Sequence, residues 1–572
     1  MRRTGPSRAV SARVVLGPAV PGFVVLLGLA ACAAPSGDTA DLVLDLVLVD
    51  GEILTMGSPG TVEALAVADG RVAAVGTSEE IRGLAGPGTR VVELNGRTVI
   101  PGLTDNHYHG IGGGSGVDLT RARSMADVID AIAAFALETA PGGLIITNRD
   151  WHEGQLAEHR LPYRDDLDGA APGQPVVVVR GGHEYVLNSP ALARWGIDES
   201  TPEVPGGRIG RYPSGRLNGE LVDRAKDLVT LPTAAPPDSA AVLDELAEEY
   251  AALNSRGLTS IRYPGGPPEQ YRAIERLRDQ GRLTVRVNYV LRAPRGAGAP
   301  PLADALATWP AMGEGDAWLR VGGVKLGVDG GFEGGLMREP YEEPWGEGGT
   351  FRGLQTVPTD RYIETVRELH RQGWRVATHA VGDAAIDLVL DGYEAAHADA
   401  PIDGLRWVIE HGFLPRDDHF PRMRALGLSV TAQNHLFVAA PSLVKYWGAD
   451  RAAWTTPVRA YLDAGIPVSL GTDSPVVPWE PWWMLHHFTT RGTISAGVLD
   501  PAQAITREEA LRAVTIGYAH LTFEEEERGT LEVGMAADLI VTADHVLECE
   551  DPCLESMAVD LTVVGGRIVY ER

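Results

Sequence analysis

With 572 residues, the chain has room for roughly three or four domains, although a barrel with insertions takes up well over about 250 residues as one domain. Hydrophobic residues make up 44% of the chain and charged residues 22%, which excludes a wholly disordered, collagenous or coiled-coil protein. Its 50 Lys and Arg against 77 Asp and Glu give a net charge of −27, which repels a phosphate backbone and argues against nucleic acid as a partner.

The first residues have the pattern of an export signal. Four arginines, at positions 2, 3, 8 and 13, precede an apolar stretch that ends in the run 23–31. This run is far shorter than the roughly 20 residues of a membrane-spanning helix, but it suits a signal-peptide core. The junction Leu29-Ala30-Ala31-Cys32 resembles the lipobox of bacterial lipoproteins, whose cysteine is lipidated and becomes the new N-terminus. We predict a signal peptide over 1–31, a lipid on Cys32 and a flexible tether over 32–41. The mature protein would then be an extracytoplasmic lipoprotein of the cell membrane, or a secreted protein if the lipobox is not used.

Short β-type runs occur at both ends of the remaining chain. Residues 42–50, 64–68 and 71–75 are apolar runs separated by Gly and Asp turns, and similar runs return at 538–542, 561–564 and 567–570. We expect both ends to build one composite β-sandwich from residues 42–98 and 525–572.

The middle of the chain alternates strand-like and helical segments. Eight strand-like runs lie at about 99–107, 257–262, 284–290, 319–327, 375–379, 406–411, 428–432 and 467–472. Helical stretches separate them, for example 361–372, where apolar residues recur at helical spacing. This alternation predicts an α/β fold, a closed (β/α)8 TIM barrel over 99–524, with its chemistry at the C-terminal ends of the strands.

One interval between the strands is much longer than the others. The segment 110–250 follows the first barrel strand and contains strand candidates of its own at 144–147 and 176–179. We predict a folded cap inserted on the active-site face of the barrel.

Metal-compatible side chains follow the predicted strand ends. His107 and His109 are alternate residues at the end of the first strand, so both imidazoles point into the barrel mouth. Lys325 lies within the fourth strand, His379 and His411 end the fifth and sixth, and Asp473 follows the eighth. Single residues of this kind are usually structural, but six on one rim predict a metal centre.

These motifs resemble a known family. The segment Pro101-Gly-Leu-Thr-Asp-Asn-His-Tyr-His109 resembles the metal-binding opening of the amidohydrolase superfamily, and Gly471-Thr-Asp-Ser-Pro475 resembles its closing aspartate motif. The segments 324–330, 378–384, 410–412 and 181–188 look like the branch that contains N-substituted formamide deformylase and YtcJ-like proteins. One departure is Gly331, where that branch commonly has serine.

The resemblance implies a role for each of the six residues. His107 and His109 would bind one metal, His379 and His411 a second, and a carbamylated Lys325 would bridge the two. Asp473 would bind the first metal and move protons. The donor types suit zinc, with manganese, cobalt or iron as substitutes. Independently of the resemblance, burial of Lys325 would disfavour its ammonium form and leave an amine able to take up carbon dioxide.

The function predicted is hydrolysis of a small molecule at a non-peptide carbon–nitrogen bond, as in an N-substituted formamide or a cyclic amide. Two alternatives remain: the same centre could hydrolyse an ester, lactone or phosphoester, or the chain could be a ligand-binding surface lipoprotein without turnover. The expected partners are the small substrate and, through the lipid alone, the membrane. We predict that His183 and Trp151 in the cap contact substrate, although either could equally be structural.

Three cysteines are too few for a disulfide framework or a cysteine-ligated zinc cluster. Beyond Cys32, Cys549 and Cys553 could pair in an oxidising compartment or remain free thiols, and their spacing leaves both possibilities open.

Overall fold

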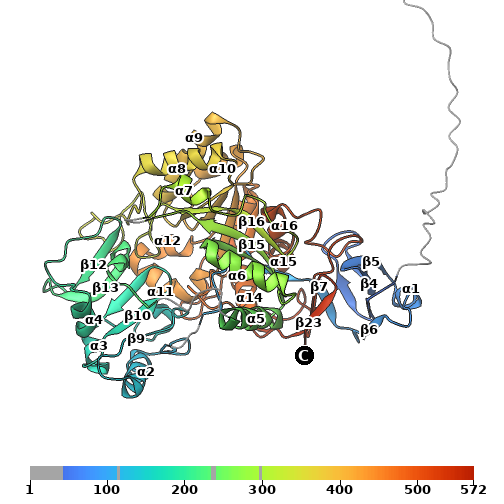
Figure 1. Ribbon diagram of the computed structural model, residues 1–572, viewed down its shortest axis with the longest axis horizontal. Coiled ribbons are helices and arrows are strands. Elements are labelled where there is room, and N and C mark those ends of the chain that lie inside the picture. Colours follow the sequence, from blue (N-terminus) through green and yellow to red (C-terminus); the bar gives the residue numbers. More distant parts are fainter. Residues whose placement is uncertain (1–42, 113–115, 233–239, 296–298) are drawn as a thin grey trace, which may run out of the picture. The chain divides into compact units, whose positions relative to one another are not determined.

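The structure is a computed structural model that describes residues 43–112, 116–232, 240–295 and 299–572 (Figure 1). The predicted signal peptide, Cys32 and the tether lie outside these residues. Among the described helices, none combines the length and the apolar character that crossing a membrane requires.

Eight parallel strands form the predicted barrel. In sheet order they are β20, β19, β18, β17, β16, β15, β14 and β8. Between the two outer strands, the N–H of Asn106 donates to the carbonyl of Leu470 at 3.2 Å, so the sheet is nearly closed on itself. The strands are β8 (Leu103–Asp105), β14 (Leu258–Gly266), β15 (Arg286–Arg292), β16 (Leu319–Gly327), β17 (Val376–Ala380), β18 (Val408–His411), β19 (Ser429–Gln433) and β20 (Val468–Gly471).

The first predicted strand, 99–107, is in fact two strands in two sheets. β7 (Thr98–Pro101) pairs with a strand from the C-terminal part of the chain, whereas β8 enters the barrel. Gly102 lies between them, and a Cβ there would come within 2.2 Å of the side chain of Thr259. Glycine therefore allows the chain to pass close to β14 as it changes sheets.

Helices cover the outside of the barrel, and α8, α9 and α10 pack side by side (Figure 1). α8 shows the predicted helical spacing, because its buried residues are Tyr362, Val366 and Leu369. The helices are α5 (Ala240–Ser255), α6 (Pro268–Asp279), α7 (Leu302–Leu306), α8 (Thr359–Arg371), α9 (Asp383–Asp399), α10 (His419–Ala425), α11 (His435–Trp447), α12 (Ala449–Ala453), α13 (Val458–Asp463), α14 (Pro481–Thr490), η3 (Pro501–Gln503), α15 (Arg507–Ala513) and α16 (Ile516–Thr522).

Two further sheets, built from both chain ends, enclose a separate apolar core. The first has the order β5-β4-β1-β6, and the second has the order β23-β22-β21-β7-β2-β3. Leu48, Val67, Val99, Val541 and Val563 are buried in this core. The elements are β1 (Leu46–Val49), β2 (Glu52–Leu54), β3 (Thr61–Val62), β4 (Ala64–Ala68), β5 (Arg71–Gly76), α1 (Ser78–Gly83), β6 (Arg90–Glu93), β21 (Leu539–Thr542), α17 (Asp551–Glu555), β22 (Val559–Val564) and β23 (Arg567–Glu571). Beside them, Cys549 and Cys553 form a disulfide, with their Cα atoms 6.0 Å apart.

The segment after the first barrel strand folds around a five-stranded sheet of order β12-β13-β11-β10-β9, and we call it the cap. The two predicted strands, 144–147 and 176–179, correspond to β9 and β10. The cap elements are α2 (Met125–Glu138), β9 (Ile145–Ile146), η1 (Glu153–Gln155), α3 (Arg164–Ala170), β10 (Val176–Arg180), β11 (Glu184–Leu187), α4 (Ser189–Arg194), β12 (Gly207–Arg211), β13 (Leu217–Asp223) and η2 (Arg224–Leu228). Buried residues on both faces of its sheet give the cap apolar clusters of its own.

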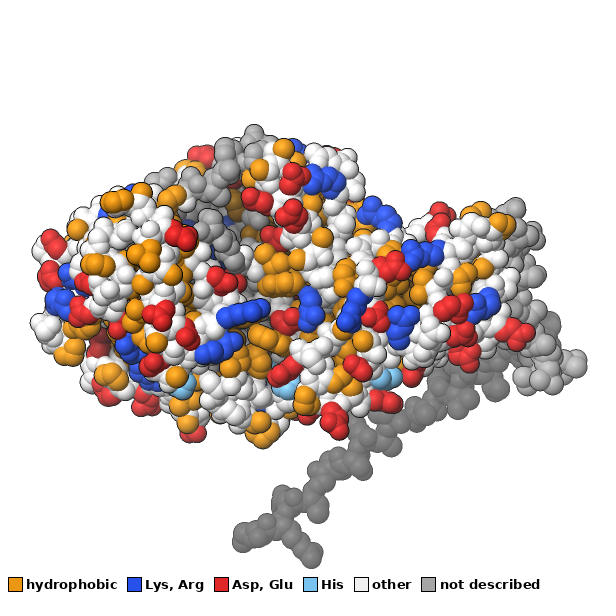
Figure 2. Space-filling view, turned by 90° about the horizontal axis from the view of Figure 1, so that it is seen from below, with side chains coloured by type: hydrophobic (Ala, Val, Ile, Leu, Met, Phe, Trp, Pro, Cys, Tyr) orange, Lys and Arg blue, Asp and Glu red, His pale blue; other side chains and the backbone are white. Residues whose placement is uncertain are grey.

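The surface reflects the composition. On the face shown in Figure 2, acidic side chains are scattered among basic and hydrophobic ones rather than gathered in one patch. The concentration of titratable groups that matters for chemistry lies inside the barrel mouth.

Candidate metal centre

His107, His109 and Asp473 meet at the closing edge of the barrel. The Nε2 atoms of His107 and His109 lie 3.5 and 3.3 Å from Oδ1 of Asp473, and donor atoms of all three lie within 4.8 Å of one another. Burial lowers the pKa of His107 to about 3, so this imidazole is neutral. Two imidazoles and a carboxylate at this spacing are a donor set for a divalent metal ion.

A buried carboxylate fixes the orientation of His107. Nδ1 of His107 donates to Oε2 of Glu410 at 3.0 Å, which leaves the lone pair on Nε2 facing the site. Oε1 of Glu410 lies 2.8 Å from the guanidinium of Arg262, and the hydroxyl of Thr431 donates to Oε2. Burial alone would raise the pKa of Glu410, but the Arg262 charge holds it well below its usual value. Glu410 therefore stays an acceptor for His107.

Lys325 lies against the same group of side chains. Its Nζ is 3.4 Å from Nε2 of His107, and burial lowers the pKa of Lys325 to about 8. Asp329, the nearby carboxylate on the same segment, is already engaged by the backbone N–H groups of Leu336, Val381 and Gly382. Among the described residues, no carboxylate lies within ion-pair distance of Lys325, so its place is not explained by a structural salt bridge.

His379 and His411 lie next to each other, with ring centroids 4.6 Å apart. Nδ1 of His411 donates to Oε1 of Gln433 at 2.7 Å, and Nε2 of His379 donates to the carbonyl of Gly330 at 3.0 Å. Burial holds the pKa of both histidines well below the usual value. Each imidazole is therefore neutral and keeps one lone pair free for a metal ion.

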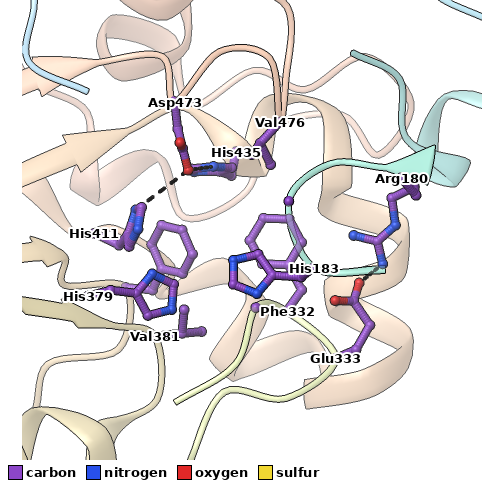
Figure 3. Close-up of a pocket in the computed structure, with 13 residues that line it drawn as sticks. Arg180, His183, Phe332, Glu333, His379, Val381, His411, His435, Asp473 and Val476 are labelled. Atoms are coloured by element: carbon purple, nitrogen blue, oxygen red, sulfur yellow. Dashed lines mark hydrogen bonds and ion pairs between the residues drawn. The ribbon is translucent and has the colours of Figure 1, made fainter. Parts of the chain in front are cut away.

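His435 also lies in the centre, although it was not among the predicted ligands. Its Nε2 donates to Oδ2 of Asp473 at 3.0 Å, and donor atoms of His411, His435 and Asp473 lie within 4.8 Å of one another (Figure 3). His379, predicted as the partner of His411, is not in that group.

A signal for His435 was present in the sequence. Thr431 and Gln433 are alternate residues of β19, and both contact the centre, through Glu410 and His411 respectively. His435 continues the same alternation at the start of α11. His107 and His109 were predicted because alternate residues of a strand face the same side, and the same reasoning applied to residues 431, 433 and 435 indicates His435.

The centre opens into a small pocket between barrel and cap. His183 lines the pocket, as predicted, and its ring stacks on that of His379 at a centroid distance of 5.3 Å. Its Nδ1 lies 2.6 Å from Oδ1 of Asp223. A Cβ at Gly331 would come within 2.7 Å of the His183 ring, so glycine leaves the space that this ring occupies.

The structure does not place Trp151 in the pocket. Its indole is fully buried in the cap core, and Nε1 donates to the carbonyl of Val179 at 2.8 Å. The prediction that Trp151 contacts substrate therefore needs correction: an aromatic residue in a folded insertion packs its own core.

Comparison with known proteins identifies the family of this chain. Residues 90–570 match the amidohydrolase family. The chain belongs to this family. It is 28% identical to N-substituted formamide deformylase of Arthrobacter pascens, over 92% of this chain and 98% of that protein. It is 26% identical to YtcJ of Bacillus subtilis, over 85% of this chain and 91% of that protein.

The fold also has close structural likenesses. A metal-dependent hydrolase of Pyrococcus horikoshii matches with a TM-score of 0.66 at 23% identity, covering 89% of this chain and 99% of that one. Because the family match covers residues 90–570, the protein is a hydrolase of the amidohydrolase family, which is typically metal-dependent. Its barrel mouth holds donor groups suited to metal ions. The resemblance to this superfamily is confirmed.

Proposed function

We propose that this amidohydrolase cleaves a non-peptide carbon–nitrogen bond of a small amide, such as an N-substituted formamide or a cyclic amide. The observation that carries the proposal is the convergence of His107, His109, Lys325 and Asp473 at one barrel mouth. The likeness to a formamide deformylase along nearly its whole length supports an amide as the substrate.

We propose two divalent metal ions as cofactors, with zinc first and manganese, cobalt or iron as substitutes. His107, His109 and Asp473 would hold one ion, and His379 and His411 the other, with His435 within reach of the second group. When bound, such ions lower the pKa of a water molecule towards neutrality and polarise a substrate carbonyl.

Lys325 is the proposed bridge between the two ions. Its buried amine has a pKa of about 8, so an appreciable fraction is uncharged near neutral pH. The Nζ lone pair would add to the carbon of carbon dioxide, and one proton would leave to solvent. The resulting carbamate would share one negative charge between two oxygens at the point where the donor groups converge.

Asp473 is suited to carry the proton. Burial would raise the pKa of Asp473, but the surrounding imidazoles hold it well below its usual value, so Asp473 is ionised. Its position beside His107 and His109 would let this carboxylate accept a proton from the attacking water. It would then return that proton to the leaving nitrogen, which is general base followed by general acid catalysis. His183 lies on the pocket wall, where a substrate carbonyl or amide would meet it.

A substrate panel on metal-loaded protein tests the proposal. Purified protein with zinc or manganese should hydrolyse formamides or cyclic amides faster than matched esters, lactones and phosphoesters, and elemental analysis should find two metals per chain. Faster turnover of the oxygen esters would replace the amide by an ester substrate. Absence of hydrolysis from every metal-loaded preparation would favour a ligand-binding protein.

We further propose that the mature protein is a lipoprotein anchored through Cys32, since a signal-like segment ends there. Cys32→Ala should release the protein from the membrane fraction and leave hydrolysis unchanged. A soluble wild-type protein that retains Met1 in intact-mass analysis would contradict the anchor.

A further inference from the structure

The wall of the pocket formed by Arg180 and Glu333 holds a buried group of charges that the proposed mechanism does not use. Arg180 ends β10, and its guanidinium lies within ion-pair distance of Glu153, Glu184 and Glu333. All four residues have exposures of 2% or less. Figure 3 shows Arg180 and Glu333 across the pocket from Asp473 and His411, with His183 between them.

This wall holds more carboxylates than cations, because three carboxylates surround the single guanidinium of Arg180. Burial and the neighbouring carboxylate of Glu220 raise the pKa of Glu184 well above its usual value, which favours its neutral form. Burial would also raise the pKa of Glu153, but the charge of Arg180 holds it below its usual value. Glu333 therefore shares its one cationic neighbour with Glu153.

Both carboxylate oxygens of Glu333 are buried and lack a hydrogen-bond donor among the described residues. Oε1 is at least ion-paired with Arg180, whereas Oε2 has neither an ion pair nor a hydrogen bond there. In Figure 3 this second oxygen points to the side of the pocket on which His183 lies. A buried carboxylate oxygen without a donor costs free energy, and a donor on a bound ligand would recover it.

A metal ion is a poor candidate for this place. Donor atoms of His152, Glu153 and Glu333 lie within 4.8 Å of one another, but the guanidinium of Arg180 is already paired with both carboxylates. A permanent cation occupies the position that a metal ion would take. What Oε2 of Glu333 lacks is a hydrogen-bond donor on the pocket side.

We propose that Glu333 binds a cationic nitrogen of the substrate, an ammonium or amidinium group, at the end of the pocket opposite the scissile bond. This inference rests on the proposed function and narrows its substrate class to small amides that carry a positive charge away from the amide. Arg180, Glu153 and Glu184 act as positioning residues, because they hold the Glu333 carboxylate at the pocket wall.

Matched formamides test this specificity in the metal-loaded enzyme. In a series with two to five methylenes, each N-(ω-aminoalkyl)formamide is compared with the N-alkylformamide in which a methyl group replaces the ammonium. For the best chain length, the wild type should favour the cation in kcat/KM by about tenfold or more, equivalent to about 1.4 kcal/mol. Glu333→Gln should abolish the preference while kcat/KM for the neutral partner changes by less than about threefold.

Glu339→Gln is the matched control, because Glu339 is an exposed carboxylate on the same connecting segment and does not line the pocket. It should keep the wild-type preference. If Glu333→Gln lowers kcat/KM for both substrates equally, together with its melting temperature, Glu333 is only a structural partner of Arg180 and the inference is wrong.

A binding measurement separates the inference from the proposed function. In ligand-observed NMR titrations of the metal-loaded protein, butylammonium should bind the wild type about tenfold more tightly than 1-butanol, and Glu333→Gln should remove the difference. Such binding without hydrolysis of any amide would refute the proposed function and retain the cation site. Hydrolysis of amides without preference for the cation in either assay would refute the cation site alone.

Discussion

The metal centre depends on a few residues held in conformations that side chains rarely adopt. His411 and Asp473 have φ values of 70° and 62°, a left-handed region that costs about 1 to 3 kcal/mol for residues with a Cβ. Backbone contacts impose this geometry, since the N–H of Asp473 donates to the carbonyl of His107 at 2.7 Å. The strain is concentrated on two proposed metal ligands, which fits a site that is preorganised before ligands bind.

Lys325 gives the sharpest prediction for a single residue. Lys325→Ala removes the proposed bridge, so we expect loss of both metals and of activity. Added short-chain carboxylic acids should partly restore both, because they supply the missing bridging oxygens. Metal content by elemental analysis and rates with and without acetate or propionate provide the measurement.

The chain has only two other lysines, Lys226 and Lys445, and Lys445 is exposed on α11. Lys445→Ala is therefore the control and should keep both metals. Two metals and no response to carboxylic acids in Lys325→Ala would show that Lys325 is structural. Mass evidence for an unmodified Lys325 in a fully active two-metal enzyme would also exclude the carbamate.

Asp473→Asn tests proton transfer. The amide keeps the shape and one oxygen donor but removes the basic site, so we expect nearly native metal content and a rate loss of about 10² to 10⁴. Rates and metal content of the same preparation must be compared. A variant with more than about a tenth of the wild-type rate would show that another group, of which His435 is the nearest candidate, carries the proton.

At the scale of single elements, two features of the strands predicted the site residues better than residue type did. These are the alternation of side chains along a strand and the position of a residue at a strand end. His107 and His109 in the first strand were predicted because their spacing is visible within three residues. Glu410 was part of a noted motif, but its role depends on Arg262, a residue of another strand, and no local pattern reveals that pair. The change of sheets at Gly102 was missed for the same reason, because the contact that requires glycine comes from Thr259.

In the cap, too, the local sequence did not reveal which contacts a residue makes. Trp151→Ala should destabilise the cap by about 3 to 5 kcal/mol, because it empties a fully buried site, and should leave metal content unchanged. His183→Ala, in the pocket wall, should change kcat/KM with little effect on stability. Denaturant unfolding, substrate kinetics and elemental analysis distinguish the two roles.

Trp151→Phe serves as the control, since it keeps most of the buried volume and loses the hydrogen bond to Val179, which contributes about 1 kcal/mol. A large shift in substrate preference for Trp151→Phe, with unchanged stability, would return Trp151 to the substrate pocket. Loss of metal from His183→Ala would place His183 among the metal ligands.

For the whole molecule, the sequence predicted which kinds of sheet form but not how they are joined. The barrel and the two-sheet domain follow from local runs of apolar residues, whereas their connection depends on charges far apart in the chain. Arg286 of β15 forms a two-pronged ion pair with Asp538, just before β21, with distances of 2.7 and 3.0 Å. Both side chains are only 7% exposed, so each depends on the other for its solvation.

This pair predicts how stability depends on pH. Burial would raise the pKa of Asp538, but the Arg286 charge holds it below its usual value. The stabilisation is therefore complete above the unfolded pKa of about 3.9 and is lost as the pH falls through the lower folded value.

Asp538→Asn should cost about 3 to 5 kcal/mol near pH 6, because it leaves Arg286 buried and unpaired. The difference from the wild type should begin to shrink as the pH falls below about 4, because the unfolded wild-type chain then binds a proton at this carboxyl that the folded protein does not. Asp560→Asn removes a more exposed partner, of Arg97 at 3.2 Å, and should cost about 0 to 1 kcal/mol. Denaturant unfolding across this pH range gives the free energy of unfolding of the wild type and both variants. A loss of stability in Asp538→Asn that stays constant down to the lowest pH would show that the ionised pair does not join the barrel to the two-sheet domain.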